Sequence, residues 1–278
     1  MTALAPIHLS IQDHLDQGHL ELPVLPEVAT KVVQLCSNPD STPGEIHDLI
    51  RRDQSLAANL LRISNSAMYS PGFEIKTLEQ AVSRLGFKRV KEATLIISCE
   101  GRVFQVKRYE TQVRQLFRHC LAASAFAEEV ARQGRRNVEE AFLCGLMHDI
   151  GCPVLLQFVA DLEKKQQTTY DIEEVLPVVS HFHANVGGML AERWNLPDRL
   201  AEAIRYHHTP DEAKECVEIA RLTNLANDLA HFAVGPKERT EQQIQEHPML
   251  VHLNIYPDEL DTILAKKDQI IDMVGVLS

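Results

Sequence analysis

The apolar residues of this chain recur mainly at intervals of three, four and seven positions, which places them on one face of an α-helix. Runs that alternate apolar and polar residues, as half-buried strands do, are missing, and aromatic residues make up only 5% of the chain. The pattern therefore predicts an all-α fold. One stretch shows the helical spacing most clearly, at Val113, Leu116, Phe117, Cys120, Ala127 and Ala131.

Several residues mark where the predicted helices begin and end. Thr42 followed by Pro43 is typical of a helix N-terminus, because threonine caps the first turn and proline fits the first helical position. Gly86 is predicted to end the helix that contains Leu78 and Leu85. Later helices are expected over about 138–148, 171–179, 183–194 and 198–208, and from about Ala213 to Phe232.

Length, charge and cysteine usage narrow the class of protein. The chain has 278 residues, of which 45% are hydrophobic, enough for one large core or two smaller ones. Its formal net charge of -11 repels phosphate backbones, so we expect no nucleic-acid partner. We find no apolar run near the roughly 18 residues of a membrane helix and no secretory signal pattern. The 6 cysteines form no C-x-x-C pair and are interpreted as reduced packing residues. A cytoplasmic protein without a membrane partner is therefore expected.

The residues that carry chemistry lie in the second half of the chain, where histidines interrupt apolar helix faces. His119 shares a predicted face with Phe126, and His183 shares one with Leu190. The same spacing places two further histidine positions on inward faces, and an aspartate follows one of them directly. The set of candidate metal ligands is His119, His148, Asp149, His183, His207 and His208.

A single inward histidine is more often a hydrogen-bonded core residue than a metal ligand. Several of them together with Asp149 are different, because each buried polar group needs a partner. One divalent cation satisfies many at once, and imidazole with carboxylate suits Fe, Mn, Ni or Zn. Glycines near the ligands, at Gly145 and the pair Gly187-Gly188, would let helices approach closely. A divalent transition-metal site is the leading interpretation, and a metal-free core of paired histidines is the alternative.

The order of these residues resembles that of the HD superfamily of metal-dependent phosphohydrolases. The segment LCGLMHDIG (143–151) carries the His-Asp dyad, and histidines stand upstream at His119 and downstream at His183 and His207-His208. In that superfamily the dyad and the outlying histidines hold one or two metals, which activate water against a phosphoester. The resemblance implies that His148 and Asp149 are catalytic if this chain is a hydrolase.

The first half of the chain narrows the resemblance to the HDOD subgroup, the HD-related output domain. The matching segments are LPVLPEVATKVVQL (22–35), RRDQSLAANLLRISNSAMY (51–69), LEQAVSRLGFKRV (78–90) and HANVGGMLAERWNLPDRLAEAIRYHH (183–208). The resemblance implies an N-terminal helical bundle packed on an HD-like helical bundle. It divides the chain into an N-terminal helical extension (1–17), an HDOD domain (18–232, with parts 18–109 and 110–232) and a C-terminal helical tail (233–278).

Two departures from the superfamily pattern bear on catalysis. The superfamily ends its ligand set with an aspartate on a late helix, and Asn224 stands at the position that matches it here. Asparagine offers a carbonyl oxygen without a charge, which lowers metal affinity. Asp228, one turn later, would replace it only if the register has shifted. The Gly-Tyr-Pro loop of the cyclic-dinucleotide phosphodiesterase branch is also missing after His208.

A third set of positions lies in the first half, at the predicted end of a helix. Asn65, Ser66 and Tyr69 stand where a capping or turn role is the simpler interpretation. As family positions they would instead shape a groove for a ligand or a partner protein.

Two functional hypotheses follow from the residues and the resemblance. The first is a bacterial signal-transduction or regulatory module that acts through contacts with signalling proteins and keeps a partial metal site. The second is a metal-dependent phosphohydrolase acting on a nucleotide or other phosphoester. A sensor that binds a nucleotide or metal without turnover is a third option. The metal content of the purified protein distinguishes the regulatory module from the other two hypotheses. Turnover of a phosphoester distinguishes the phosphohydrolase from the sensor.

Overall fold

The computed structural model describes residues 6–65, 75–99, 103–104, 106–235 and 239–277, and within those ranges it contains helices and no strand. The predicted all-α fold is confirmed. Contacts between the helices divide the chain into two compact units. We call them the N-terminal unit, formed by residues 24–105 and 272–278, and the histidine unit, formed by residues 1–23 and 106–271.

The N-terminal unit is a small helical bundle centred on one helix, α5, which contacts the three helices that precede it. The predicted helix start at Thr42 is confirmed by a capping box, in which the side chains of Thr42 and Glu45 each bond the other's backbone N–H. The helices of this unit are α2 (Glu27–Ser37), α3 (Pro43–Ile50), α4 (Gln54–Ser64) and α5 (Leu78–Ser98).

The sequence predicts that Gly86 ends its helix, and in the structure this residue interrupts α5 instead. Its backbone has φ 71° and ψ 167°, outside the helical region, so α5 consists of two helical segments joined at this residue. Positive φ is strained for residues that carry a Cβ atom, and glycine adopts it freely. The segment after Gly86 continues as a helix, so the glycine changes the direction of the chain without ending the element.

The histidine unit is built around α6 (Glu110–Gln133), which contacts both α7 (Val138–Met147) and α11 (Val217–Val234). A second group of helices continues from α7: α8 (Gly151–Gln166) lies against α9 (Ile172–Arg193), and α9 lies against α10 (Asp198–Tyr206). The remaining helices are α1 (Pro6–Asp16), α12 (Glu241–Gln245), α13 (Pro248–His252), α14 (Pro257–Leu264) and α15 (Lys267–Leu277), of which α15 spans the division between the units.

Two glycines allow the helices of this unit to approach at backbone distance. A Cβ atom on Gly145 of α7 would lie 2.7 Å from the carbonyl oxygen of Ala123 on α6. A Cβ atom on Gly151, the first residue of α8, would lie 2.1 Å from the carbonyl oxygen of His183 on α9. Real Cβ atoms do not reach such distances, so only glycine fits at either position. These contacts bring the ends of α7 and α8 against α6 and α9.

Two helices differ from the sequence prediction. The structure contains α8 over Gly151–Gln166, which was not predicted, and one continuous α9 where two helices over 171–179 and 183–194 were expected. Pro153 of α8 lies in the first turn, where the missing N–H has no helical partner to lose. Pro177 lies inside α9 but on its exposed side, so the carbonyl oxygen that it leaves without a helical partner can bond water.

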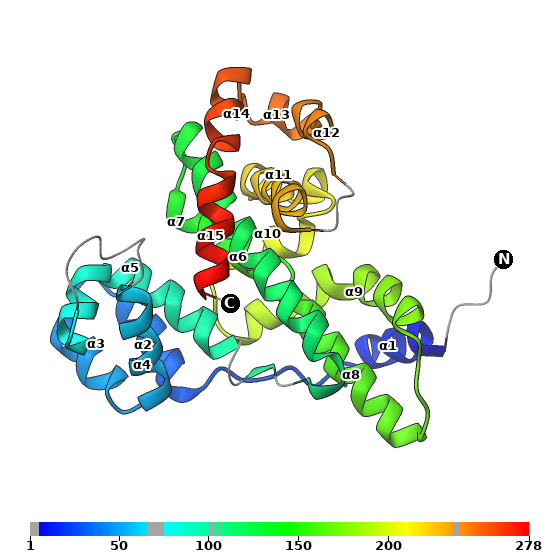
Figure 1. Ribbon diagram of the computed structural model, residues 1–278. Coiled ribbons are helices and arrows are strands. Elements are labelled where there is room, and N and C mark those ends of the chain that lie inside the picture. The colour runs from blue at the N-terminus through cyan, green and yellow to red at the C-terminus, as the bar shows by residue number, and fades with distance from the viewer. Residues whose placement is uncertain (1–5, 66–74, 100–102, 105, 236–238, 278) are drawn as a thin grey trace. The chain divides into compact units, whose positions relative to one another are not determined.

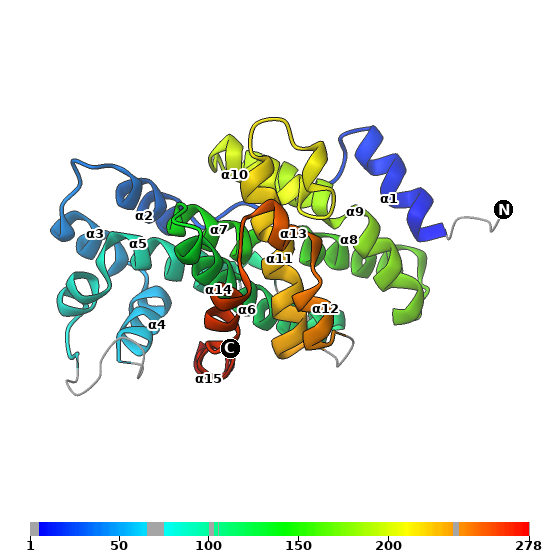
Figure 2. The ribbon, with the colours of Figure 1, turned by 90° about the horizontal axis from the view of Figure 1, so that it is seen from above.

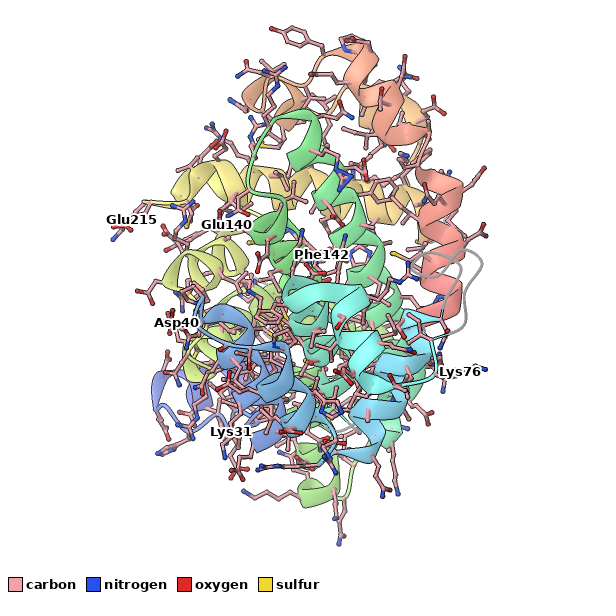
Figure 3. All side chains as sticks on the ribbon, turned by 90° about the vertical axis from the view of Figure 1, so that its left-hand side faces the viewer. Lys31, Asp40, Lys76, Glu140, Phe142 and Glu215 are labelled. Carbon is pink, nitrogen blue, oxygen red and sulfur yellow. The ribbon has the colours of Figure 1, made fainter. Side chains whose placement is uncertain are left out.

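The stretch Val138–Gln166, which contains α7 and α8, is long and apolar enough by composition to cross a membrane. The prediction that the chain has no apolar stretch of this length is therefore wrong. In the structure, 78% of its most apolar window is buried, as in the core helix of a globular unit. Within this stretch His148 and Glu163 are buried, whereas Glu140 of α7, labelled in Figure 3, is partly exposed and accepts a hydrogen bond from Arg199 Nε of α10 over 2.7 Å.

Candidate metal centre

The predicted ligands meet inside the histidine unit, because each lies on a helix face or helix end that points to one place. His119 is in the middle of α6, and His183 is in the middle of α9. His148 and His207 are the C-cap residues of α7 and α10, so Asp149 and His208 follow in the turns after those helices. The histidines on α6, α7, α9 and α10 are nearly or fully buried, whereas His208 is exposed.

The first ligand group consists of His119, His148 and Asp149. The two Nε2 atoms lie 3.2 Å apart. Asp149 Oδ2 lies 3.3 Å from His148 Nε2 and 3.9 Å from His119 Nε2. One carboxylate oxygen and two imidazole nitrogens therefore face a common point.

The second ligand group consists of Asp149, His183, His207 and His208. It uses the other carboxylate oxygen: Asp149 Oδ1 lies 3.1 Å from His183 Nε2 and 3.6 Å from His207 Nε2. His183 Nε2 lies 3.3 Å from His207 Nε2 and 3.1 Å from His208 Nε2. Asp149 is thus shared between the two groups, with one oxygen for each.

Backbone hydrogen bonds fix the tautomer of three of these histidines. In each, Nδ1 lies within 2.8 Å of the carbonyl oxygen three residues earlier, so it carries the proton and donates it. In the neutral ring, Nε2 is then an acceptor with its lone pair directed inward, as a metal ligand requires. The pairs are His148 with Gly145, His183 with Ser180, and His207 with Ile204.

The spacing of the ligand atoms fits a divalent transition metal. Metal–ligand bonds of about 2.0–2.2 Å place neighbouring ligand atoms about 3.0–3.5 Å apart in octahedral or tetrahedral geometry. Five contacts among the predicted ligand atoms fall between 3.1 and 3.3 Å: His119–His148, His148–Asp149, His183–Asp149, His183–His207 and His183–His208. Inward lone pairs at this separation repel one another unless a cation lies between them. The donor set suits Fe, Mn, Ni or Zn.

Burial keeps most of these imidazoles in the neutral form that binds metals. It lowers the pKa of His119 to about 3 and that of His207 well below its usual value. The pKa of the more exposed His208 is lowered to about 4, again chiefly by burial. His148 differs: burial by itself lowers its pKa, but the adjacent Asp149 carboxylate outweighs burial and raises it. The site therefore favours one positive charge beside Asp149, supplied by the His148 proton when no metal is bound.

Asp149 stays ionised in spite of its surroundings. Burial by itself raises the pKa of this carboxyl, but His148 and His183, both within hydrogen-bond distance, hold it well below its usual range. The shared ligand therefore carries its negative charge at any pH at which the histidines are neutral, and it is the principal charge that a cation would meet here.

The structure places a different residue from the predicted one at the last ligand position. The sequence predicts Asn224 at this position, but the amide nitrogen of Asn224 donates to the carbonyl oxygen of His207 over 2.8 Å. The oxygen that reaches the first group belongs to Asn227, whose Oδ1 lies 3.0 Å from His119 Nε2 and 3.2 Å from His148 Nε2. The register is one helical turn later than expected, and Asp228 points to other partners. The position still carries an amide and no carboxylate.

His231 is a second residue that the sequence analysis did not single out. It lies one turn after Asn227 on α11, and its ring centroid is 4.3 Å from that of His119. The Nδ1 atom of His119 is buried and makes no hydrogen bond within the described part of the chain. The four-residue spacing of Asn227 and His231 was the signal available in the sequence, since it places both on one face of α11.

Only Asn65 of the predicted groove lies in the described part of the chain, because Ser66 and Tyr69 fall outside the described residues. The Asn65 side chain bonds the backbone of Ile75 in both directions: Nδ2 donates to the carbonyl oxygen and Oδ1 accepts from the N–H, each over 2.7 Å. Asn65 thus ties the C-terminal end of α4 to the backbone at Ile75, which agrees with its simpler interpretation as a capping or turn residue.

The metal-free protein should lose stability as the pH falls below about 6.5. The folded chain holds His119 neutral with a pKa of about 3, whereas an unfolded histidine takes up a proton near pH 6.5. Between those values the unfolded state binds more protons, so falling pH favours it, by about 2 kcal/mol between pH 6.5 and 5 for this residue. Chemical denaturation in the presence of a chelator, at several pH values, measures the slope. A His119→Gln variant with the same slope would contradict this assignment.

Fold and site together define an all-α protein with a buried centre of metal-ligand residues. The HDOD domain model matches residues 22–210, and the chain therefore belongs to the HDOD family. Solved structures share the fold. A candidate metal-dependent phosphohydrolase from Shewanella amazonensis has a TM-score of 0.75 over 100% of both chains at 21% identity. An HDOD domain protein from Geobacter sulfurreducens has a TM-score of 0.71 over 98% of both chains at 21% identity.

A third structure, a candidate signal transduction protein from Marinobacter aquaeolei, is 25% identical and has a TM-score of 0.67. The match covers 100% of this chain and 67% of that protein. The chain spans 45% and 22% of the lengths of two curated relatives that it matches. Those relatives are thus considerably longer than the region that they share with this chain.

Proposed function

We propose that this chain is a bacterial signal-transduction module of the HDOD type that binds one or two divalent transition-metal ions and acts through contacts with signalling proteins. The position of Asp149, with its two oxygens facing two separate groups of imidazole nitrogens, carries the metal-binding part of the proposal. The signalling part is supported by membership of the HDOD family and by the name of the Marinobacter aquaeolei relative. The negative charge of the chain and its free cysteines favour a cytoplasmic protein without a nucleic-acid partner.

Asn227 favours regulation over rapid turnover. In the first group it supplies a neutral oxygen where a carboxylate would add a second negative charge. A divalent ion is held less tightly by the smaller charge, so its occupancy should vary with metal supply. A centre of this kind suits a module whose state depends on metal binding.

A metal-dependent phosphohydrolase is the second candidate function, and the shared position of Asp149 favours it. Two-metal phosphoester hydrolysis uses two ions close together, and bound ions supply a water nucleophile near neutral pH. The chain's own contribution is to hold the ions: Asp149 serves both groups, and backbone-fixed histidines complete each one. A nucleotide or another phosphoester would be the substrate.

Metal content tests the proposal directly. Protein purified without chelator should contain one or two transition-metal ions per chain by inductively coupled plasma mass spectrometry. After chelator treatment, it should take up Mn²⁺ or Zn²⁺ again, and affinity should fall as the pH is lowered because His148 must lose its proton to bind. A chain that contains no metal and takes up neither ion would refute metal binding and leave the histidines as a polar core.

Turnover separates the two candidate functions. The metal-loaded chain is incubated with bis-p-nitrophenyl phosphate and with cyclic and linear nucleotides, and the released product is quantified. Metal binding without release, at protein concentrations that exceed substrate, supports the regulatory function. Release that a chelator abolishes, and that the Asp149→Asn variant lacks, supports the phosphohydrolase.

A further inference from the structure

Asn227 and Asp228 are neighbours on α11, and their side chains share a hydrogen bond. Asn227 Nδ2 donates to Asp228 Oδ1 over 3.3 Å. The other end of the same amide, Oδ1, lies 3.0 Å from His119 Nε2 in the first ligand group. Because a carboxylate accepts hydrogen bonds and cannot donate them, Asp228 selects the amide orientation in which the carbonyl oxygen faces the histidines.

Asp228 is in turn held by residues that follow α11 in the chain. Arg239 Nη2 lies 3.1 Å from one carboxylate oxygen and 3.0 Å from the other. His247 Nε2 lies 3.2 Å from Oδ2. The Nδ1 atom of His247 accepts a hydrogen bond from the backbone N–H of Met249, so the ring donates to Asp228 through Nε2. Asp228 is 9% exposed and His247 is 8% exposed, so their contact is largely shielded from water, whereas the Arg239 side chain is 43% exposed.

We propose that Asp228 is a positioning residue of the metal centre, and that the segment 239–249 acts on metal binding through it. The inference rests on the proposed function, because Asn227 matters here only as a metal ligand. An amide that is free to turn presents its NH₂ group as readily as its oxygen, and an N–H dipole directed at a cation is repelled. Asp228 removes that alternative before the metal arrives. The segment 239–249 lies beyond the residues 22–210 that match the family model. Metal binding would therefore depend on residues outside the matched region.

The first test is the effect of Asp228→Asn on Mn²⁺ affinity in the full chain. An amide at this position both donates and accepts, so it no longer selects one orientation of Asn227. Titration calorimetry of chelator-treated protein with MnCl₂ should show about tenfold weaker binding at the first group, the range that outer-shell changes produce. The second group lacks Asn227 and should keep its affinity.

The decisive test repeats this substitution in an Asn227→Asp background, where its effect should reverse. A carboxylate at 227 has no N–H to donate, and it would meet the Asp228 carboxylate across the 3.3 Å that the hydrogen bond now spans. Like charges this close repel. Asp228→Asn removes the repulsion and supplies a donor, so the double variant should bind Mn²⁺ about tenfold more tightly than Asn227→Asp alone. A residue that only anchors the segment 239–249 would weaken binding in both backgrounds.

Glu218→Gln is the matched control on the same helix. Glu218 pairs with Arg136 over 2.8 Å, and Arg136 also donates to the carbonyl oxygen of Leu253. The substitution thus removes an ion pair of α11 whose arginine also bonds Leu253, in the part of the chain that follows α11. It leaves Asn227 unchanged, so Mn²⁺ affinity should not change.

The outcomes separate this inference from the proposed function. If the native chain takes up neither Mn²⁺ nor Zn²⁺, the proposed function fails as well; if it takes up Zn²⁺ alone, the same titrations are made with ZnCl₂. If the native chain binds Mn²⁺ and Asp228→Asn leaves its affinity unchanged, or weakens it in both backgrounds, only the inference is overturned. Should Asp228→Asn prove unfolded by circular dichroism, Arg239→Gln replaces it. That variant should weaken binding by about threefold, less than the 10–100-fold typical of outer-shell partners, because Arg239 acts on Asn227 only through Asp228. Unchanged affinity would overturn the inference.

Discussion

Asp149→Asn should abolish metal binding at both ligand groups, with affinity reduced by more than about 100-fold. Changes to residues around a metal site cost about 10–100-fold, and this substitution removes an ionised ligand whose oxygens serve the two groups separately. Asp149 Oδ2 lies 3.3 Å from His148 Nε2, and Oδ1 lies 3.1 Å from His183 Nε2. An asparagine keeps the shape but loses the charge and replaces one acceptor with a donor. Mass spectrometry of the purified variant and calorimetric titration with Mn²⁺ measure the loss.

Asp161→Asn is the control for this experiment. Asp161 is an exposed residue of α8 whose carboxylate accepts from Gln157 on the helix surface, so the same chemical change there should leave metal content unaltered. Loss of metal from one group only, with the other at native affinity, would show that Asp149 is not shared between them. Native metal content in Asp149→Asn would remove the central observation behind the proposed function.

Gly151→Ala should destabilise the histidine unit by about 3 kcal/mol and weaken the second ligand group at the same time. The added Cβ atom would lie 2.1 Å from the carbonyl oxygen of His183 and 2.6 Å from the backbone nitrogen of Gly187. Backbone atoms cannot turn aside as a flexible side chain can, so α8 and α9 must move apart, and overpacking of this kind costs about 1–3 kcal/mol or more. The movement separates His183 from Asp149, which lies two residues before the start of α8. We expect the Tm to fall by roughly 6–12 °C and Mn²⁺ affinity to fall with it.

Gly275→Ala provides the comparison. Gly275 is also helical, but a Cβ atom there meets nothing within 4 Å, and alanine is favoured over glycine in a helix by about 1 kcal/mol. The control variant should therefore be as stable as the native chain or slightly more stable, with unchanged metal affinity. An unchanged Tm for Gly151→Ala would mean that α8 and α9 do not approach as closely as the structure shows.

Much of the candidate centre was predictable from the sequence because helical periodicity fixes which side of a helix a residue occupies. His119 and His183 each share an apolar stripe, and the structure places both in the core of the histidine unit. The helix start at Thr42 and a break in the helix at Gly86 were also predictable. A helix N-terminus favours a threonine cap, and a positive φ favours glycine. The all-α fold followed from the same local patterns.

Two further features depended on how the helices pack. The sequence predicted Asn224 as the last ligand position, but the rotation of α11 against α6 turns Asn227 toward His119 and leaves Asn224 on the carbonyl oxygen of His207. Residues three apart lie on nearly the same face of a helix, so periodicity cannot choose between them. α8 was not predicted, and α9 was expected as two helices over 171–179 and 183–194, whereas the structure continues one helix through residues 180–182.

The sequence by itself determined that this chain folds as helices, that it carries histidines on inward faces, and that an aspartate accompanies them. Only the tertiary structure decided that Asp149 divides its two oxygens between two groups of imidazoles, and that Asp228 is bound to Arg239 and His247 instead of the histidine centre. The physical reason is that helical spacing sets the direction of a side chain relative to its own helix axis, whereas distances between helices are set by close packing at residues such as Gly145 and Gly151.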